Sequence, residues 1–144
     1  MKVIIAGDRE CIDYDLLEFS IKESGFDITE IVSGGARGAD ALGEMWAKKN
    51  NVPVKKFPAK WDDIKAKGAV VKVRENPWTH KKEKYNTNAG FTRNSEMILY
   101  ADAVIALQPN GKTPGTQHTI KEAIKKGLSV YVYEKEDKDY EYQF

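Results

Sequence analysis

The chain contains the stretch Ile31-Val32-Ser33-Gly34-Gly35-Ala36-Arg37-Gly38-Ala39-Asp40, its clearest structural signal. A β-branched run ends at Ser33, two glycines follow, and small residues open a helical pattern that continues to about Lys49. A strand, a glycine turn and a helix start in this order direct unpaired backbone N–H groups and the positive end of the helix dipole toward an anion. Arg37 adds a full positive charge at the same place. The stretch therefore predicts a phosphate-binding turn in an α/β protein.

Short apolar runs alternate with helical patterns along most of the chain. The runs expected to form strands are Lys2–Ala6, Ile28–Val32, Val52–Phe57, Ala103–Leu107 and Ser129–Tyr133. Their nearly continuous hydrophobicity is typical of parallel strands covered on both faces. Helical patterns run from a cap at Asp13 to Gly25, from Ala39 to about Lys49, from Asn88 to Tyr100 and from Thr116 to Lys126. We therefore predict an α/β fold, a doubly wound Rossmann-like parallel sheet of about five strands with helices on both faces.

The length of 144 residues is that of one domain. We expect a single domain over residues 1–133, a basic insertion at about 62–86 and an acidic and aromatic tail at 134–144. Within the insertion, Val71 and Val73 alternate with charged residues, and Asn76-Pro77 is a turn signal. These features predict a hairpin or a mobile flap, and so long a connection in a compact domain is usually functional or disordered.

The composition excludes several classes of protein. Hydrophobic residues make up 41% and charged residues 31%, which is ordinary for a globular domain. The net charge of +1 argues against nucleic-acid affinity over the whole surface. Cys11 is the only cysteine, and His80 and His118 lie far apart, so we expect no disulfide, no metal site and no cofactor. The apolar N-terminal run is too short for a signal peptide or for the roughly 20 residues of a membrane span, which predicts a cytoplasmic protein without membrane contact.

Three loops are expected to meet at the carboxyl edge of the sheet, where α/β proteins bind ligands. They follow the first, second and fourth predicted strands, and right-handed crossovers bring all three to one edge. A fourth element, the helix containing Arg93, adds a guanidinium that can pair bidentately with a phosphate. For each of them, a glycine turn, a helix cap or a solvent-exposed charge is the structural alternative. The predicted ligand-binding residues are Gly7, Asp8, Arg9, Ser33, Gly34, Gly35, Arg37, Gly38, Arg93, Asn94, Gly115 and Thr116.

The three tryptophans have different expected roles. Trp46 lies at core spacing with Leu42, so packing is expected. For Trp61 and Trp78 we expect packing at the rim of the crevice, with stacking on a nucleobase as the alternative. The lysine-rich insertion around Trp78 is either a solvated face or a surface for nucleic acid.

Six segments stand in a characteristic order: Val3-Ile4-Ile5-Ala6-Gly7-Asp8-Arg9, residues 31–40, Phe57-Pro58-Ala59-Lys60-Trp61, Thr92-Arg93-Asn94-Ser95-Glu96-Met97, Ala101-Asp102-Ala103 and Gly115-Thr116. As a set they resemble the SLOG superfamily, the Rossmann-like group with the Smf/DprA proteins and the Lonely Guy phosphoribohydrolases. The likeness is to its small single-domain branch, common in bacteria and their phages, and covers nearly the whole chain except Lys65–Asn86 and the tail. It implies a nucleotide crevice with phosphate at Gly34, Gly35, Gly38, Gly115 and Thr116, and with Arg93 at ribose and phosphate. It also implies a homo-oligomer.

The resemblance also exposes a departure. In the phosphoribohydrolases a PGGxGTxxE segment supplies the acid that acts at the glycosidic bond, whereas here Thr119 takes the glutamate position and a single glycine follows Pro114. Cleaving a ribosyl–base bond passes through a cation-like centre and needs a carboxylate nearby. The catalytic residues are unknown, and the candidates are Asp8 and Glu122.

The sequence therefore predicts binding more strongly than cleavage. We expect a sensor or sequestering protein for a phosphate-bearing nucleotide derivative of the AMP, NAD or ADP-ribose type, cyclic forms included, with weak or no catalysis. Nucleotide N-glycoside hydrolysis is the enzymatic alternative. A third hypothesis is that the insertion binds single-stranded nucleic acid, and we favour it less than the binding of a nucleotide-derived small molecule.

Overall fold

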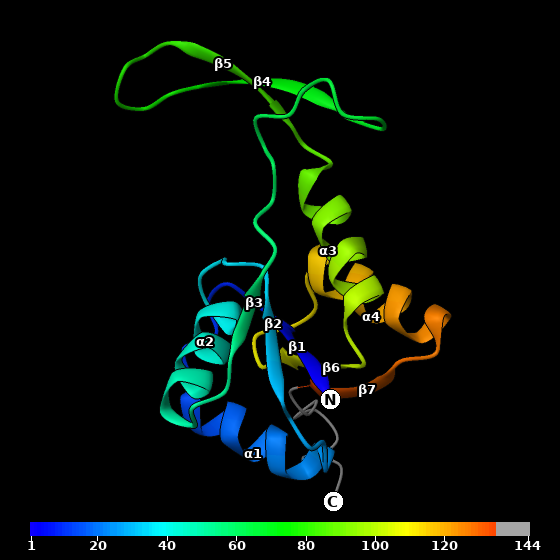
Figure 1. The fold of residues 1–144 in the computed structure, drawn as a ribbon. Coiled ribbons are helices and arrows are strands. Elements are labelled where there is room, and N and C mark those ends of the chain that lie inside the picture. Colours follow the sequence, from blue (N-terminus) through cyan, green and yellow to red (C-terminus); the bar gives the residue numbers. More distant parts are fainter. Residues whose placement is uncertain (135–144) are drawn as a thin grey trace, which may run out of the picture.

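The computed structural model describes residues 1–134, whose centre is a five-stranded parallel sheet (Figure 1). The strand order is β3-β2-β1-β6-β7. The strands are β1 (Lys2–Gly7), β2 (Glu30–Ser33), β3 (Val54–Lys56), β6 (Ala103–Gln108) and β7 (Ser129–Glu134). Every neighbouring pair in this sheet is parallel. The predicted α/β, Rossmann-like fold is confirmed.

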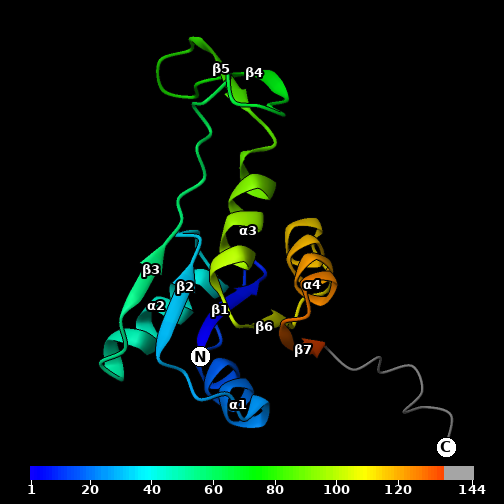
Figure 2. The ribbon, with the colours of Figure 1, turned by 45° about the vertical axis from the view of Figure 1, so that its right-hand side comes forward.

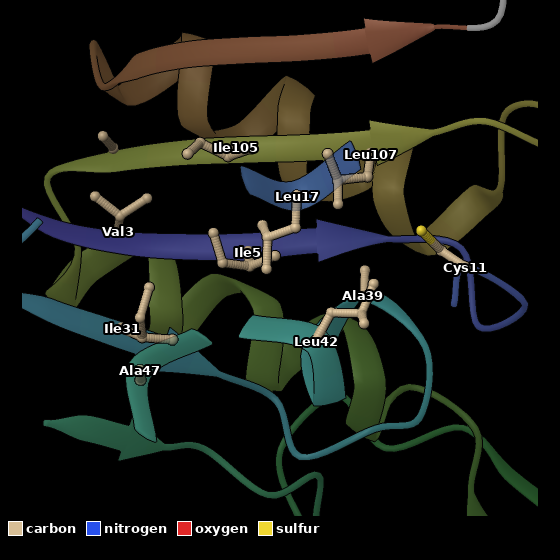
Figure 3. Packing of buried hydrophobic residues seen from close by; sticks show 11 residues of the cluster. Val3, Ile5, Cys11, Leu17, Ile31, Ala39, Leu42, Ala47, Ile105 and Leu107 are labelled. Carbon is tan, nitrogen blue, oxygen red and sulfur yellow. The ribbon is translucent and has the colours of Figure 1, made fainter. Parts of the chain in front are cut away.

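Helices cover both faces of the sheet (Figures 1 and 2). On one face lie α1 (Tyr14–Ser24) and α2 (Ala39–Lys49), and on the other α3 (Ala89–Tyr100) and α4 (Pro114–Lys126). Side chains of a strand alternate between faces, so Val3 and Ile5 join the α1–α2 cluster, shown in Figure 3, while Ile4 and Ala6 join the α3–α4 cluster. Each fully buried valine or isoleucine stabilises the fold by roughly 1.5–3 kcal/mol. The sheet is therefore held from both sides.

The helix ends follow the sequence signals closely. The Asp13 carboxylate accepts a hydrogen bond from the Leu16 amide at 3.0 Å and caps α1, and Gly25 ends that helix at a φ of 69°. Gly127 ends α4 in the same left-handed conformation. The α4 helix begins at Pro114, two residues before the predicted start, because proline suits the first helical position.

The third strand is shorter than predicted. The apolar run Val52–Phe57 yields only the three residues of β3. Pro53 has no N–H to donate, and the Val52 amide bonds the Ala47 carbonyl at the end of α2. The local bond of Val52 and the missing N–H of Pro53 therefore leave the first two residues of the run in the connection, although the Pro53 carbonyl still accepts the Ile31 amide of β2 at 2.9 Å.

The connections reverse direction between β1 and β6. From β1 the chain moves outward through β2 to β3, with α1 and α2 on one face, and then returns through α3 to β6 on the other side of β1. The loops leaving β1 and β6 diverge to opposite faces, which opens a crevice at their carboxyl ends. The topology thus fixes where a ligand site is expected.

A two-stranded hairpin stands apart from the sheet and helices in both views (Figures 1 and 2). It consists of β4 (Val71–Glu75) and β5 (Lys82–Asn86), which pair antiparallel with Val73 opposite Lys84. The predicted hairpin is therefore present. We call residues Val70–Thr87 the arm.

The root of the arm is fixed to the body. The Asn86 side chain accepts a hydrogen bond from the Val70 amide at 3.1 Å, and the Asn86 amide donates to the Trp61 carbonyl at 2.7 Å. The Trp61 ring packs against Gly90 in the first turn of α3. The packing role expected for Trp61 is thus present, and Trp46 packs against the core cluster as predicted. For Trp78 the packing prediction is wrong, because this side chain, in the turn of the arm, is 89% exposed.

Candidate functional site

A crevice of about 400 Å³ opens at the carboxyl edge of the sheet between β1 and β6. A neighbouring hollow of about 550 Å³ continues from it past Gly34 and Gly35 to Trp61. Arg9, Arg37 and Arg93 line both spaces. The structure thus brings residues of all three predicted loops and of α3 to one place. The predicted ligand-binding residues that line one or both spaces are Gly7, Asp8, Arg9, Gly34, Gly35, Arg37, Arg93, Asn94, Gly115 and Thr116.

Arg93 connects the walls of the crevice. Its Nη1 donates to the Gly34 carbonyl at 2.6 Å, and its Nε donates to Asn94 Oδ1 at 3.0 Å. Asn94 Nδ2 in turn donates to the Gly115 carbonyl at 3.4 Å. A Cβ at Gly34 would overlap the Arg93 guanidinium, so glycine is required there for the arginine to reach the carbonyl. This chain of bonds joins the turn after β2, the α3 helix and the start of α4.

Asp40 is a crevice residue that the sequence reasoning missed. Its Oδ2 accepts a hydrogen bond from the Ala36 amide at 3.1 Å. Burial raises the pKa of Asp40 to about 6, although the Ala36 bond and the charges of Arg93 and Arg9 lower it. Burial also lowers the pKa of Arg93, and Asp40 opposes that shift. The available signal was an acidic residue in the first turn of α2, directly after the glycine turn.

The turn before α2 uses much of its own hydrogen-bonding capacity. The Gly35 amide donates to Ser33 Oγ at 3.0 Å, the Ala36 amide to Asp40, and the Ala39 amide to the Asp8 carbonyl at 3.2 Å. The expectation of wholly unpaired N–H groups at this turn is therefore corrected. A ligand anion at this end of the crevice meets arginine side chains rather than an open ring of amides.

Two predicted binding residues have internal contacts instead of lining the crevice. The Ser33 hydroxyl donates to Glu44 Oε2 at 3.1 Å while it accepts the Gly35 amide. At Gly38 φ is +78°, and a Cβ would overlap the carbonyl oxygens of Asp8 and Arg9. Ser33 and Gly38 shape the turn, because each holds neighbouring backbone in place.

The first turn of α4 forms the opposite wall. The amides of Gly115 and Thr116 lie where no preceding helical turn supplies a carbonyl. The Thr113 hydroxyl donates to the Thr116 hydroxyl at 2.8 Å, and no side chain caps this helix. Thr119 lines the crevice at the position where the resemblance leads one to expect an acid, and its hydroxyl donates to the Gly115 carbonyl at 3.2 Å. This wall offers hydroxyl groups and a helix N-terminus.

The two candidate acids are in different places. Asp8 is 7% exposed and lines the crevice, where its Oδ1 accepts the Glu10 amide at 2.7 Å. Glu122 lines a separate hollow with Leu99 and Lys125. The structure therefore does not bring Glu122 to the crevice, and the buried or half-buried carboxylates there are Asp8 and Asp40.

Arg37 forms an exposed ion pair across the mouth of the crevice. Its Nη2 lies 3.0 Å from Glu10 Oε1, and both side chains are more than 70% exposed. Such a pair contributes little to stability because water screens it. Arg37 can therefore exchange Glu10 for a ligand anion at little cost.

Within residues 1–134, no group of three or more His, Cys, Asp or Glu side chains has the arrangement of a metal site. None of the helices in this range has the length and apolar composition that a membrane span requires.

Comparison with known proteins places the chain in a family. A model of the YspA, cpYpsA-related SLOG family matches residues 1–63. Gene 61 protein of Mycobacterium phage D29 is 30% identical over 138 residues, which cover 90% of this chain and 93% of that protein. The chain belongs to the SLOG family. The family-model match includes the loops after β1 and β2, and the arm, Arg93 and the start of α4 lie beyond it.

The crystal structure of DNA processing protein A (DprA) from Streptococcus pneumoniae superposes on this SLOG protein with a TM-score of 0.66 at 19% sequence identity. The match covers 96% of this chain and 52% of the DprA chain, so the SLOG protein spans about half of that relative. At this identity the likeness shows the shared α/β fold.

Proposed function

We propose that this SLOG protein binds a phosphate-bearing nucleotide derivative in the crevice, as a sensor or sequestering protein with weak or no catalysis. The observation that carries the proposal is that Arg9, Arg37 and Arg93 line two adjoining spaces at the point where the strand order reverses. Arginine side chains bind phosphates bidentately and remain charged when partly buried. Together the two spaces have the size of a site for a whole nucleotide rather than for a free anion.

The two spaces of the site suit different parts of such a ligand. A phosphate between Arg9, Arg93 and the first turn of α4 is stabilised by two full charges and by the helix dipole. The rest of the ligand then extends into the hollow that ends at Trp61, a residue that is 37% exposed. AMP, NAD, ADP-ribose and their cyclic forms share this combination of phosphate and planar base.

Weak catalysis is the expectation because the crevice carboxylates already have internal partners. Asp8 accepts the Glu10 amide, Asp40 accepts the Ala36 amide beside Arg93, and Thr119 stands where the phosphoribohydrolases have an acid. One observation favours the enzymatic alternative, nucleotide N-glycoside hydrolysis. The pKa of Asp40, raised to about 6, suits a general acid near neutral pH.

Isothermal titration with AMP, NAD, ADP-ribose and 3′,5′-cyclic AMP tests the binding proposal. We expect saturable heat with at least one of them, and loss of that heat in Arg93→Ala. Arg74→Ala, which removes an exposed arginine of the arm, is the matched control. Absence of binding by all four ligands at millimolar concentration refutes the proposal. Mass spectrometry of small molecules that co-purify with the native protein identifies the ligand class directly.

Incubation with AMP followed by chromatography separates binding from hydrolysis. Under our proposal AMP remains intact. Release of adenine that is lost in Asp40→Asn and retained in Glu122→Gln supports the hydrolase instead, because Asp40 lines the crevice and Glu122 lines a separate hollow.

We also propose a homo-oligomer. Leu99 of α3 and Ile124 of α4 are 71% and 62% exposed. Contact of these apolar side chains with water is unfavourable, and burial in an interface between two copies removes it. Light scattering coupled to size exclusion gives the mass. A monomer at all concentrations contradicts this part of the proposal without affecting the crevice.

A further inference from the structure

The arm is a surface that the crevice does not explain. Its strands pair with each other and project beyond the carboxyl edge of the sheet (Figures 1 and 2). All five residues of β4 and the first three of β5 are exposed. A two-stranded hairpin with both faces in water is only marginally stable by itself. Hydrogen bonds at its root join it to the residues around Trp61.

Positive charge is concentrated on the arm. Its five basic side chains are Lys72, Arg74, Lys81, Lys82 and Lys84, and its two acidic ones are Glu75 and Glu83. Because the whole chain has a net charge of only +1, the remainder is net negative. Among the described residues, the contact between a basic nitrogen and a carboxylate on the arm joins His80 Nδ1 to Glu75 Oε1 at 3.6 Å, and it involves none of the five. The arm therefore presents cations with no carboxylate partner in residues 1–134.

The turn of the arm holds an aromatic ring in water. Trp78 is 89% exposed, yet the backbone that carries it is well fixed. The Asn76 side chain accepts the amides of Trp78 and Thr79 at 2.8 and 3.2 Å, and the Asn76 amide donates to the Lys81 carbonyl at 2.8 Å. A hydrogen-bonded turn that exposes an indole, with Lys81 and Lys82 following it in the sequence, loses less entropy than an open loop when a planar group stacks on that indole.

The two strands of the arm also combine cationic side chains with apolar and aromatic ones. Residues directly opposite each other share a face, so Val71 and Val73 lie with Lys82 and Lys84 on one side. On the other side, the Arg74 guanidinium lies over the Tyr85 ring, 4.9 Å from its centroid. Cationic groups interleaved with aromatic and apolar surface match the alternation of phosphate and base along a nucleic-acid strand. An acidic protein segment offers the charge but not the regularly repeated planar groups.

We propose that the arm binds single-stranded nucleic acid, with its lysines on the phosphates and an unpaired base stacked on Trp78. Unpaired bases are required because a duplex hides their faces inside the stack. The surface is separate from the crevice, so this binding and nucleotide binding can succeed or fail independently.

Fluorescence anisotropy with a labelled oligodeoxythymidylate of about 20 nucleotides tests the proposal on the full chain. We expect Trp78→Ala to weaken binding about tenfold, the typical effect of losing one stacked base. Removing two phosphate contacts in Lys82→Ala/Lys84→Ala is expected to lower the steepness of the salt dependence by about 1.4 in log K against log salt, since each contact with a single strand contributes about 0.7. The matched controls are Phe19→Ala, an exposed aromatic of α1, and Lys22→Ala/Lys48→Ala on α1 and α2. They are expected to bind like the wild type.

Several results overturn the proposal. Absence of binding at about 50 mM salt does so, as does binding that the arm variants leave unchanged. Equal affinity for duplex DNA of the same length, or equal displacement by poly-glutamate, shows that the arm recognises charge alone. Loss of the oligonucleotide in Arg93→Ala but not in the arm variants places the strand in the crevice instead. Circular dichroism of each variant separates these outcomes from loss of the fold.

Discussion

The crevice and the arm contain similar numbers of charged residues but hold them in opposite ways. In the crevice, Arg93 and Asp40 are half-buried, and each is hydrogen-bonded to backbone of the turn after β2. On the arm, the cations are exposed, and water surrounds them. Partly buried charges have fixed geometry and shifted pKa values, whereas exposed charges produce a field that salt screens. The comparison indicates geometric recognition in the crevice and salt-sensitive recognition on the arm.

The largest change in stability is expected from a substitution in the turn before α2, which shapes the crevice. Gly38→Ala is expected to lower the free energy of unfolding by about 3 kcal/mol, because a positive φ and overlap with two carbonyl oxygens combine there. Gly68→Ala is the control, since Gly68, at the foot of the arm, has a φ of +80° but no atom within 4 Å of the added Cβ. Its expected cost is about 1 kcal/mol, from backbone conformation alone. Urea unfolding measures both, and equal losses would mean that close packing at Gly38 does not matter.

The next largest effect is a difference in ligand affinity between substitution of an arginine in the crevice and substitution of an arginine on the arm. Arg93→Ala is expected to weaken the binding of ADP-ribose about 30-fold, or roughly 2 kcal/mol, because it removes a partly buried charged donor. Arg74→Ala on the arm is expected to change the same affinity less than about twofold, since exposed charges act weakly at a distance. Isothermal titration gives both values. Equal weakening by the two variants contradicts the assignment of phosphate to the crevice.

A third prediction uses the raised pKa of a crevice residue, Asp40. Because the folded-state pKa of Asp40 is raised from 3.8 to about 6, its contribution favours folding fully below pH 3.8 and is lost as the pH rises through 6. The difference in unfolding free energy between the wild type and Asp40→Asn is therefore expected to shift by about 1 kcal/mol against the wild type between pH 5 and 7.5. Urea titrations at both pH values measure it. A constant difference shows that the pKa of Asp40 is not raised in the folded protein.

The smallest change in the free energy of unfolding is expected from substitutions on the arm. Val73→Ala and Trp78→Ala are each expected to change the free energy of unfolding by less than about 0.5 kcal/mol, since both side chains are mainly in water. The matched control is Val104→Ala in β6, where the side chain is fully buried and about 2 kcal/mol is expected to be lost. Thermal or urea unfolding measures the free energy of unfolding of all three variants. A large loss in the arm variants reveals that the arm packs against something, such as a second copy of the chain.

Most of the fold follows from local sequence signals. The apolar runs predict the strands of the sheet, and Asp13, Gly25 and Gly127 mark helix ends through capping rules that depend on neighbours in the chain. The prediction fails at Val52 and Pro53, where a hydrogen bond to Ala47 and a missing N–H shorten β3. It fails at Trp78 because an aromatic residue in a polar segment gives no local sign of whether it packs.

The sequence by itself determined the α/β architecture, the glycine turn before α2 and the presence of Arg93, because periodicity and backbone freedom are local properties. Only the tertiary structure decided how these residues act. It directs the amides of the glycine turn to Ser33, Asp40 and Asp8, separates Glu122 from the crevice and raises the pKa of Asp40. It also isolates the basic arm from the body. Hydrogen-bond partners, burial and the distance between charges depend on residues far apart in the chain, and no local pattern contains them.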